Sequence, residues 1–143
     1  MPTSPAKPWS PDSAITKTRL IRASLDRVWL ALTDSQELSR WSGDPCQVDL
    51  RVGGRVKLFG DFMSGAILEL VPLQRIIYTW RTNGWPSDWA DSMVTFTVEA
   101  TPKGTRLRLV HQGLPTEQEF RDHADGWNRY FLGPMKRYLE QQS

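Results

Sequence analysis

Two histidines, one cysteine and one strand glutamate are the residues of this chain best suited to chemistry. The histidines are His111 and His123, and Cys46 is the only cysteine. A metal site needs three or four such ligands close together, and Cys46 lies far from both histidines, on a different predicted element. The chain also lacks the motifs of serine nucleophiles, zinc helices, dithiols and phosphate-binding loops. We therefore assign no catalytic residues, no metal site and no cofactor, and expect no enzyme activity.

His111 is the more informative histidine. It follows Leu107 and Leu109 at a spacing of two, so all three share one face of a predicted strand. That face is apolar and should point toward the protein interior. His111 is then either a hydrogen-bonded core histidine or a polar anchor inside a pocket.

Glu69 is a candidate acid because its strand has no clear inner face. In GAILELVP, residues 65–72, both alternating sets are largely apolar. An inward Glu69 would need a partner such as His111 or Arg81, or a raised pKa, and would be the best candidate for acid–base work. The alternative is a solvated glutamate on the outer face of the sheet.

The elements that must position these residues follow a simple order: one strand, two short helices, six further strands and a long helix. Two short helices are predicted at residues 25–32 and 34–41, the first capped by Ser24 and the second by Thr33 or Asp34. Strands are predicted at residues 15–22, 47–51, 56–59, 65–71, 75–82, 92–100 and 105–112. The loops between most of the strands have hairpin length, so the sheet of about seven strands should be antiparallel.

A long helix from about residue 116 closes the chain. Its apolar residues recur every three or four positions, at Phe120, Ala124, Trp127, Phe131, Met135 and Tyr138. Gly133 and Pro134 fall inside it, and proline should kink the helix there. A helix this apolar on one face cannot stand free. The sequence therefore predicts a sheet wrapped around the helix, in the α+β class, with a cavity between them.

The residues expected to face that cavity come from strands and helix together. Tyr78 and Trp80 share a face of one strand, and Trp127 and Phe131 share the inner side of the helix. A fully packed core is the alternative, because protein interiors are close-packed. The predicted cavity residues are Val56, Leu58, Glu69, Tyr78, Trp80, Phe96, Leu109, His111, Trp127 and Phe131.

Two of the seven tryptophans lie in a predicted loop, residues 83–91. Trp85 and Trp89 are surrounded there by turn residues, and a tryptophan in a surface loop usually covers something. We predict that both lie over the mouth of the cavity. Packing on the C-terminal helix, or on a second subunit, is the alternative.

Composition excludes several classes of function. The net charge of +2 over 143 residues gives no electrostatic case for binding nucleic acid. No apolar run is long enough to span a bilayer, and residues 1–13 lack the apolar core of a signal peptide. Those 13 residues are rich in proline and serine and are predicted to form a disordered arm before a single domain, residues 14–143. With one cysteine and no signal, we expect a cytoplasmic protein, either a monomer or a homodimer.

Several motifs in order resemble one family. RVWLALTDSQELSRW (27–41), VGGRVKL (52–58), GAILELVP (65–72), RIIYTWR (75–81), TRLRLVHQGLP (105–115) and GWNRYF (126–131) are similar to the activator of heat-shock-protein-90 ATPase homologue family. This family belongs to the SRPBCC, or START-like, superfamily with the helix-grip fold, and the resemblance covers about residues 15–140. It implies a curved antiparallel sheet around a long C-terminal helix, with two short helices after the first strand.

Three functions remain open at this stage. The leading hypothesis is non-enzymatic binding of a small hydrophobic molecule, a lipid or an aromatic, polyketide-like compound, in the sheet–helix cavity. The second, implied by the family resemblance, is a co-chaperone or stress-response partner of a heat-shock-protein-90-type ATPase. The third is a cyclase- or hydrolase-like enzyme, which would need an inward acid or base.

Overall fold

The structure, a computed structural model, describes residues 8–141, and part of the predicted arm (1–13) lies outside this range. One antiparallel sheet of seven strands dominates it, in the order β1-β7-β6-β5-β4-β3-β2. The strands are β1 (Ala14–Ile21), β2 (Gln47–Val48), β3 (Arg55–Leu58), β4 (Met63–Val71), β5 (Arg75–Thr82), β6 (Ser92–Thr101) and β7 (Gly104–Gln112). The predicted seven-stranded sheet is confirmed.

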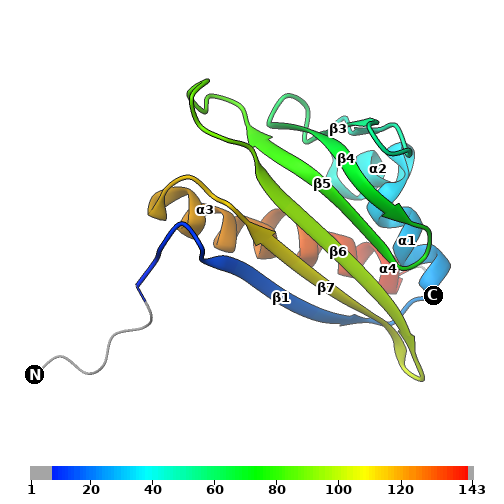
Figure 1. The fold of residues 1–143 in the computed structure, drawn as a ribbon. Helices are drawn as coiled ribbons and strands as arrows, with labels where there is room; N and C mark the ends of the chain where they lie inside the picture. The colour runs from blue at the N-terminus through cyan, green and yellow to red at the C-terminus, as the bar shows by residue number, and fades with distance from the viewer. Residues whose placement is uncertain (1–7, 142–143) are drawn as a thin grey trace, which may run out of the picture.

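Two short helices connect β1 to β2. α1 (Leu25–Thr33) begins after Ser24, whose side chain accepts a hydrogen bond from the Arg27 amide. α2 (Ser35–Ser42) begins after Asp34, which caps it in the same way, and ends at Gly43 in the left-handed conformation. Both helices lie at one end of the sheet (Figure 1).

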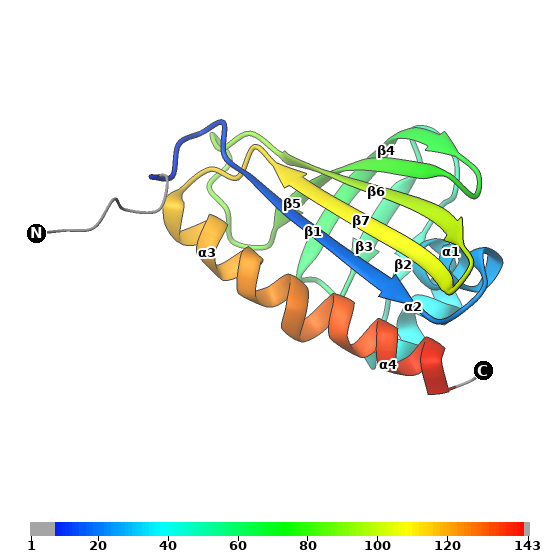
Figure 2. The same cartoon turned by 90° about the horizontal axis from the view of Figure 1, so that it is seen from below.

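The C-terminal helical segment runs beneath the concave side of the sheet (Figure 2). It comprises α3 (Glu117–Gly126), a π-helical segment η1 (Trp127–Leu132) and α4 (Gly133–Gln141). The sheet and this segment together form the predicted helix-grip arrangement. β1, the first strand in the chain, pairs with β7, the last, along its full length from Ala14 to Ile21.

Strict alternation of apolar residues places the core between sheet and helix. On β5, Ile76, Tyr78 and Trp80 are buried while their neighbours are partly exposed, and β6 and β7 follow the same pattern. Because side chains alternate between the two faces of a strand, this period of two gives the sheet one buried face. Trp127, Phe131 and Met135 meet that face from the helix side and are also buried.

β4 breaks this alternation. The pairing of β4 with β5 shifts register between Ile67 and Glu69, which marks a β-bulge at Leu68. Ile67 lies opposite the inward Tyr78, whereas Glu69 lies opposite Ile77, whose neighbours on β5 face inward. The bulge therefore turns Glu69 to the outer face, where its carboxylate accepts a hydrogen bond of 2.7 Å from the Arg75 guanidinium. The inclusion of Glu69 among the cavity residues is therefore wrong, and the alternative of a glutamate on the outer face is what the structure shows. A strict period of two cannot anticipate the bulge.

The predicted interruption of the last helix by proline takes an unexpected form. The Gly133 amide donates to the Asn128 carbonyl, five residues back, as in a π-helix. The π-helical hydrogen bonds give way to α-helical ones at Gly133, where α4 begins. Pro134 fits at this start because it has no amide hydrogen to donate. The wider turn lets Trp127, Phe131 and Leu132 all lie buried against the sheet. The chain stays helical through Gly133 and Pro134.

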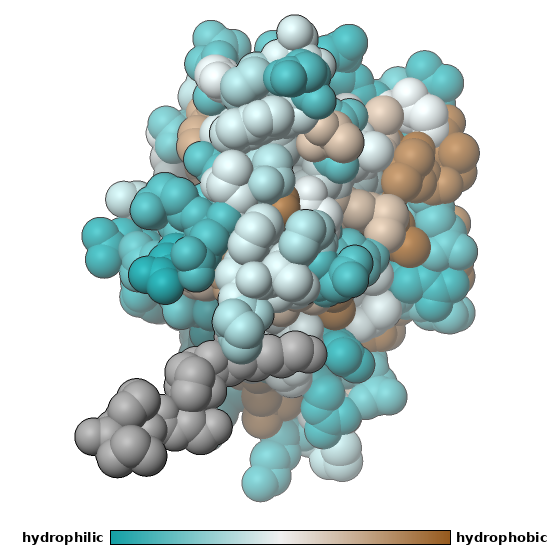
Figure 3. Space-filling model, turned by 60° about the vertical axis from the view of Figure 1, so that its left-hand side comes forward, coloured by the Kyte–Doolittle hydropathy of each residue, from teal (hydrophilic) through white to brown (hydrophobic). Residues whose placement is uncertain are grey.

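The surface is mostly polar. In the face shown in Figure 3, apolar residues appear in separate areas among polar ones rather than as one continuous band. Among the described residues, large apolar side chains that are more than 40% exposed include Leu30, Val52, Phe62, Leu68 and Tyr130. Scattered exposure of this kind is normal in folded proteins.

Two glycines of the last helical segment should respond oppositely to alanine. A Cβ on Gly133 would lie 2.8 Å from the Asn128 carbonyl oxygen, which is too close for the π-turn to persist. A Cβ on Gly126 would meet only a Tyr130 ring carbon at an ordinary 3.8 Å. We predict that Gly126→Ala raises the free energy of unfolding by about 0.5–1 kcal/mol through helix propensity. Gly133→Ala should lower it by about 1–3 kcal/mol because of the clash. Urea unfolding of both variants measures the difference, and equal stabilisation by both would contradict the π-helical geometry.

Candidate functional site

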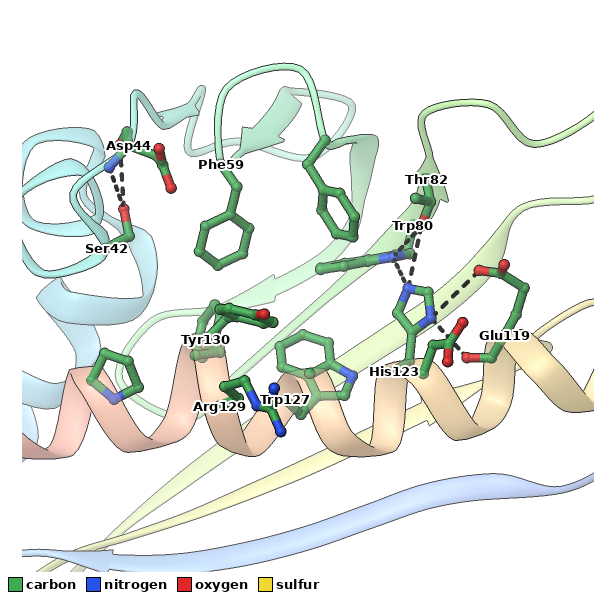
Figure 4. A pocket seen from close by; sticks show the side chains of 15 residues that line it. Ser42, Asp44, Phe59, Trp80, Thr82, Glu119, His123, Trp127, Arg129 and Tyr130 are labelled. Atoms are coloured by element: carbon green, nitrogen blue, oxygen red, sulfur yellow. Dashed lines mark hydrogen bonds and ion pairs between the residues drawn. The ribbon is translucent and has the colours of Figure 1, made fainter.

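A pocket of about 620 Å³ lies between the C-terminal helix and the strands β3 to β5 (Figure 4). Its size falls within the range of small-molecule sites in proteins. The helix supplies one wall, the end of β5 supplies another, and the loop from Phe59 to Phe62 closes over it. Ser42 at the end of α2, and Asp44 just after it, form the far end.

Aromatic side chains make up most of the walls. Phe59 and Phe62 come from the loop, Trp80 from β5, and Trp127 and Tyr130 from the helix. Ring centroids are 6.2 Å apart for Phe59 and Phe62, 6.5 Å for Phe62 and Trp80, and 4.9 Å for Trp80 and Trp127. Phe62 is 44% exposed and Tyr130 is 61% exposed, although both side chains carry a large apolar ring.

The helix contributes its residues through simple helical periodicity. Glu119, His123, Trp127, Tyr130 and Pro134 follow one another at spacings of four or three, so they line one face. Trp127 and Tyr130 belong to the π-helical segment, and such segments are often found at functional sites.

Backbone hydrogen bonds hold the loop that covers the pocket. Gly60 donates to the Pro45 carbonyl at 2.8 Å, and Asn83 donates to the Phe62 carbonyl at 2.7 Å. Phe59 adopts a left-handed backbone conformation with φ of 57°, which is uncommon for a residue with a side chain. This conformation lets the loop reverse direction while the Phe59 ring stays on the pocket side (Figure 4). Phe62 lines the pocket as well.

His123 forms the polar end of the pocket. Its Nε2 accepts a hydrogen bond of 3.1 Å from the Trp80 indole and lies 3.2 Å from the Thr82 hydroxyl. An indole nitrogen only donates, so this Nε2 carries no proton. Its Nδ1 therefore carries the proton and donates to the Glu119 carbonyl at 2.8 Å. The geometry assigns a neutral imidazole with a defined tautomer.

His111 lies deeper and is completely buried. Its Nδ1 accepts from the Trp127 indole at 3.0 Å, so its proton sits on Nε2, which donates to Ser92 Oγ at 2.8 Å. Ser92 in turn donates to the Trp80 carbonyl at 2.9 Å. Both ring nitrogens of His111, the Trp127 indole nitrogen and the Ser92 hydroxyl are therefore hydrogen-bonded, as buried polar groups require. His111 is therefore a hydrogen-bonded core histidine, the first of the two interpretations that the sequence allowed.

Burial lowers the pKa of both histidines. For His111 the shift is large and is reinforced by the nearby His123. For His123, burial lowers the pKa, while the hydrogen bond to the Glu119 backbone and the charges of Glu119 and Asp122 act in the opposite direction. Both rings are therefore neutral near pH 7, in agreement with their hydrogen bonds.

The structure brings only part of the predicted cavity set to this pocket. Trp80, Trp127 and Phe131 line it. The other inward residues are buried in the packed core behind these walls, as the close-packing alternative requires; they are Val56, Leu58, Tyr78, Phe96, Leu109 and His111. Burial raises the pKa of Tyr78, so its hydroxyl stays protonated. Glu69 lies on the opposite face of the sheet, paired with Arg75.

The two loop tryptophans do not line the pocket. Trp85 is buried against α3, where its indole donates to the Glu119 carboxylate at 2.9 Å and its ring lies 6.2 Å from that of His123. Trp89 packs on Trp85 at 6.0 Å, and Arg81 holds the loop by donating to the Trp89 carbonyl. Trp85 thus packs on the C-terminal helix, which is the alternative left open by the sequence, whereas Trp89 packs on Trp85.

Sequence reasoning missed Phe59, Phe62, His123 and Tyr130. The helical face from Glu119 to Pro134 was readable from its spacing, and it contains His123 and Tyr130. Phe59 and Phe62 carried no such signal, because both lie in a loop whose path depends on tertiary hydrogen bonds.

Residues 8–141 contain neither a candidate metal site nor a candidate membrane-spanning helix. No group of three or more histidine, cysteine, aspartate or glutamate side chains is placed to hold a metal ion in this range. No helix in the same range is both long and apolar enough to cross a membrane.

Comparison with known proteins identifies relatives. The profile of the family described as "Activator of Hsp90 ATPase homolog 1-like protein" matches residues 22–140. The activator of 90 kDa heat shock protein ATPase homolog of Dictyostelium discoideum is 30% identical over 109 residues, which are 75% of this chain and 28% of that protein. The chain spans about a third of the length of the curated relatives it matches, between 28% and 39%.

Solved structures with the same fold include two informative neighbours. The crystal structure of an HSP90 activator from Plasmodium falciparum superposes with a TM-score of 0.80 at 26% identity, covering 88% of this chain and 95% of that one. The crystal structure of CalU16 from Micromonospora echinospora has a TM-score of 0.76 at 30% identity, covering 91% and 76%.

The lowered pKa values of His111 and His123 predict a specific pH dependence of stability. In the folded state both histidines release their protons below the ordinary value of 6.5, so the unfolded chain binds more protons as the pH falls past that value. The contribution of the two neutral histidines to the free energy of unfolding is thus fully present above about pH 6.5 and is lost as the pH falls below this value. The slope should reach at most about 1.4 kcal/mol per pH unit for each histidine.

Urea unfolding between pH 7.5 and 5.5 measures this slope, and His123→Gln should reduce it. Glu69, whose pKa is lowered chiefly by its hydrogen bond with Arg75, loses its contribution only at more acidic pH. A free energy of unfolding that stays flat across this range would contradict the assignment of two neutral buried histidines.

Proposed function

This chain belongs to the activator of Hsp90 ATPase homolog 1-like family, and on that premise we propose that it binds a small, largely aromatic molecule between its sheet and its C-terminal helix. The observation that carries the proposal is the aromatic pocket of about 620 Å³. A purely structural core would fill such a space with side chains.

The exposure of Phe62 and Tyr130 supports this proposal. Both rings border the pocket, and both leave a large part of their surface in water. Covering apolar surface is favourable by roughly 25 cal/mol per Å². A flat ligand between these two rings and Trp80 would cover them, and it would stack better on the aromatic walls than a flexible lipid chain.

The hydrogen bonds of His123 favour binding over catalysis. Nε2 accepts from Trp80, and Nδ1 donates to the Glu119 carbonyl. A general base needs a free nitrogen within reach of the substrate proton. Glu69, the other acid–base candidate, lies outside the pocket. We therefore propose a binding protein without catalytic activity of its own.

Binding of a neutral fluorescent probe tests the proposal. N-phenyl-1-naphthylamine should show saturable fluorescence enhancement with one site per chain. The double variant Phe62→Ser/Tyr130→Ser should weaken binding about tenfold, because it removes two rings of the pocket wall. Leu68→Ser, which removes an exposed apolar side chain of β4 outside the pocket, is the matched control.

An absence of saturable binding would contradict the proposal. Equal loss of affinity in the Leu68→Ser control would also contradict it, since the probe would then bind exposed apolar surface in general. Thermal unfolding of the three proteins confirms that each is folded.

Family membership favours a second function, as a partner of a heat-shock-protein-90-type chaperone. The relatives in Dictyostelium discoideum and Plasmodium falciparum are named as activators of that ATPase or as homologues of such activators. The match to the first covers only 28% of its length, so the activity of the whole relative is a proposal for this chain.

The ATPase rate of a purified heat-shock-protein-90-type chaperone tests this second function. If the chain is sufficient, adding it in molar excess should raise the rate in a saturable manner, and heat-denatured chain should have no effect. An unchanged rate at saturating concentration would remove this function for the isolated chain.

A further inference from the structure

We infer that the ligand of this pocket carries a positive charge, as an amine or quaternary ammonium group on an aromatic or apolar body. This inference rests on the proposed function, since it names the chemical class of the molecule that the same pocket binds. It follows from two properties of the walls, the density of aromatic rings and the sign of the charges between them.

The aromatic rings provide surfaces that attract cations. Phe59 and Trp80 approach the pocket from the loop and the sheet, and Trp127 and Tyr130 approach it from the helix (Figure 4). Each ring face carries partial negative charge, so a cation within about 6 Å of several rings is stabilised, whereas an anion is repelled. Tyr130 is 61% exposed and Phe62 is 44% exposed, so these two rings are open to a ligand, whereas Trp80 and Trp127 have exposures of 2% and 3% and contribute little open surface.

The charged side chains of the walls are mostly negative. Asp44 lies at one end of the pocket, and Glu119 and Asp122 lie at the other. Among the described lining residues, Arg129 is the one positive side chain, and its guanidinium lies 3.4 Å from the Asp125 carboxylate. The formal charge of the lining is thus about −2, although the whole chain carries +2. The charge of the pocket lining is therefore opposite in sign to the net charge of the protein.

The hydrogen bonds of these carboxylates do not neutralise them. Glu119 accepts from the Trp85 indole at 2.9 Å, and Asp122 accepts from the Gln118 amide at 2.9 Å. Both donors are neutral. His123, whose Nδ1 lies 3.7 Å from the Glu119 carboxylate, would compensate that charge only if it were protonated on both nitrogens, but its Nε2 accepts a hydrogen bond from the Trp80 indole and therefore carries no proton. The negative charge at this end therefore remains available to a ligand.

A carboxylate ligand would meet unfavourable surroundings in the same place. Its charge would lose water and meet the carboxylates of the lining, and its one cationic neighbour among the described lining residues, Arg129, is shared with Asp125. An ammonium group in the pocket would instead gain two favourable terms, the carboxylates of the lining and the exposed rings of Phe62 and Tyr130.

Three probes with one aromatic skeleton test the inference by isothermal titration calorimetry. They are naphthylmethyl compounds carrying a trimethylammonium, a hydroxyl or a carboxylate group. We expect the cation to bind about tenfold more tightly than the alcohol and the carboxylate to bind more weakly than either. Raising the salt concentration should narrow the difference, because salt screens charges that remain near solvent.

Matched variants separate the pocket charges from the charge of the whole protein. Glu119→Gln/Asp122→Asn should remove most of the preference for the cation. Glu117→Gln, which removes a carboxylate from an exposed pair on the same helix outside the pocket, should leave the preference unchanged.

Equal affinity for all three probes, or tightest binding of the carboxylate, would overturn the inference while leaving the proposed function intact. Binding of none of the three would overturn both. The same loss of preference in the Glu117→Gln variant would also overturn the inference, since the effect would then come from overall charge.

Discussion

The hydrogen bond from the Trp127 indole to buried His111 fixes the C-terminal helix against the sheet. His111 has no exposure, so neither partner could turn to water without leaving a buried polar atom unpaired. The same imidazole continues through Ser92 to the Trp80 carbonyl, which ties the helix to two further strands. Trp80 then donates to His123 on the helix, so the chain of hydrogen bonds returns to its starting element. These bonds set the positions of both tryptophans in the pocket wall.

The pocket exists because the helix and the sheet meet closely at one side only. Phe131 stacks on Phe96 at 5.4 Å, where helix and sheet are in direct contact. Toward β3 and β4 the space is bridged by Phe59 and Phe62 from a loop, and there the packing leaves a volume open. The π-helical turn widens the helix at this point and directs Tyr130 toward the opening. The architecture thus combines a rigid contact with an adaptable aromatic surface.

Much of the fold could be predicted from local patterns, because the period-two and helical spacing of apolar residues can be recognised within each element separately. β5 was predicted with its exact limits, and Ser24 was recognised as a cap. Glu69 could not be placed, since the bulge beside it arises from pairing between strands. The site could be predicted from the sequence less well than the fold. His123 was set aside although its helical face was visible, and Phe62 depends on a loop that only tertiary hydrogen bonds define.

The central claim is that the aromatic pocket is a binding site rather than a gap in the core. Native mass spectrometry of the protein purified from cells, followed by extraction of any bound compound, tests it most directly. The account predicts a bound small molecule with an aromatic body at one per chain, released on unfolding. Protein free of any bound compound, with no shift in thermal unfolding across a panel of aromatic compounds, would contradict it.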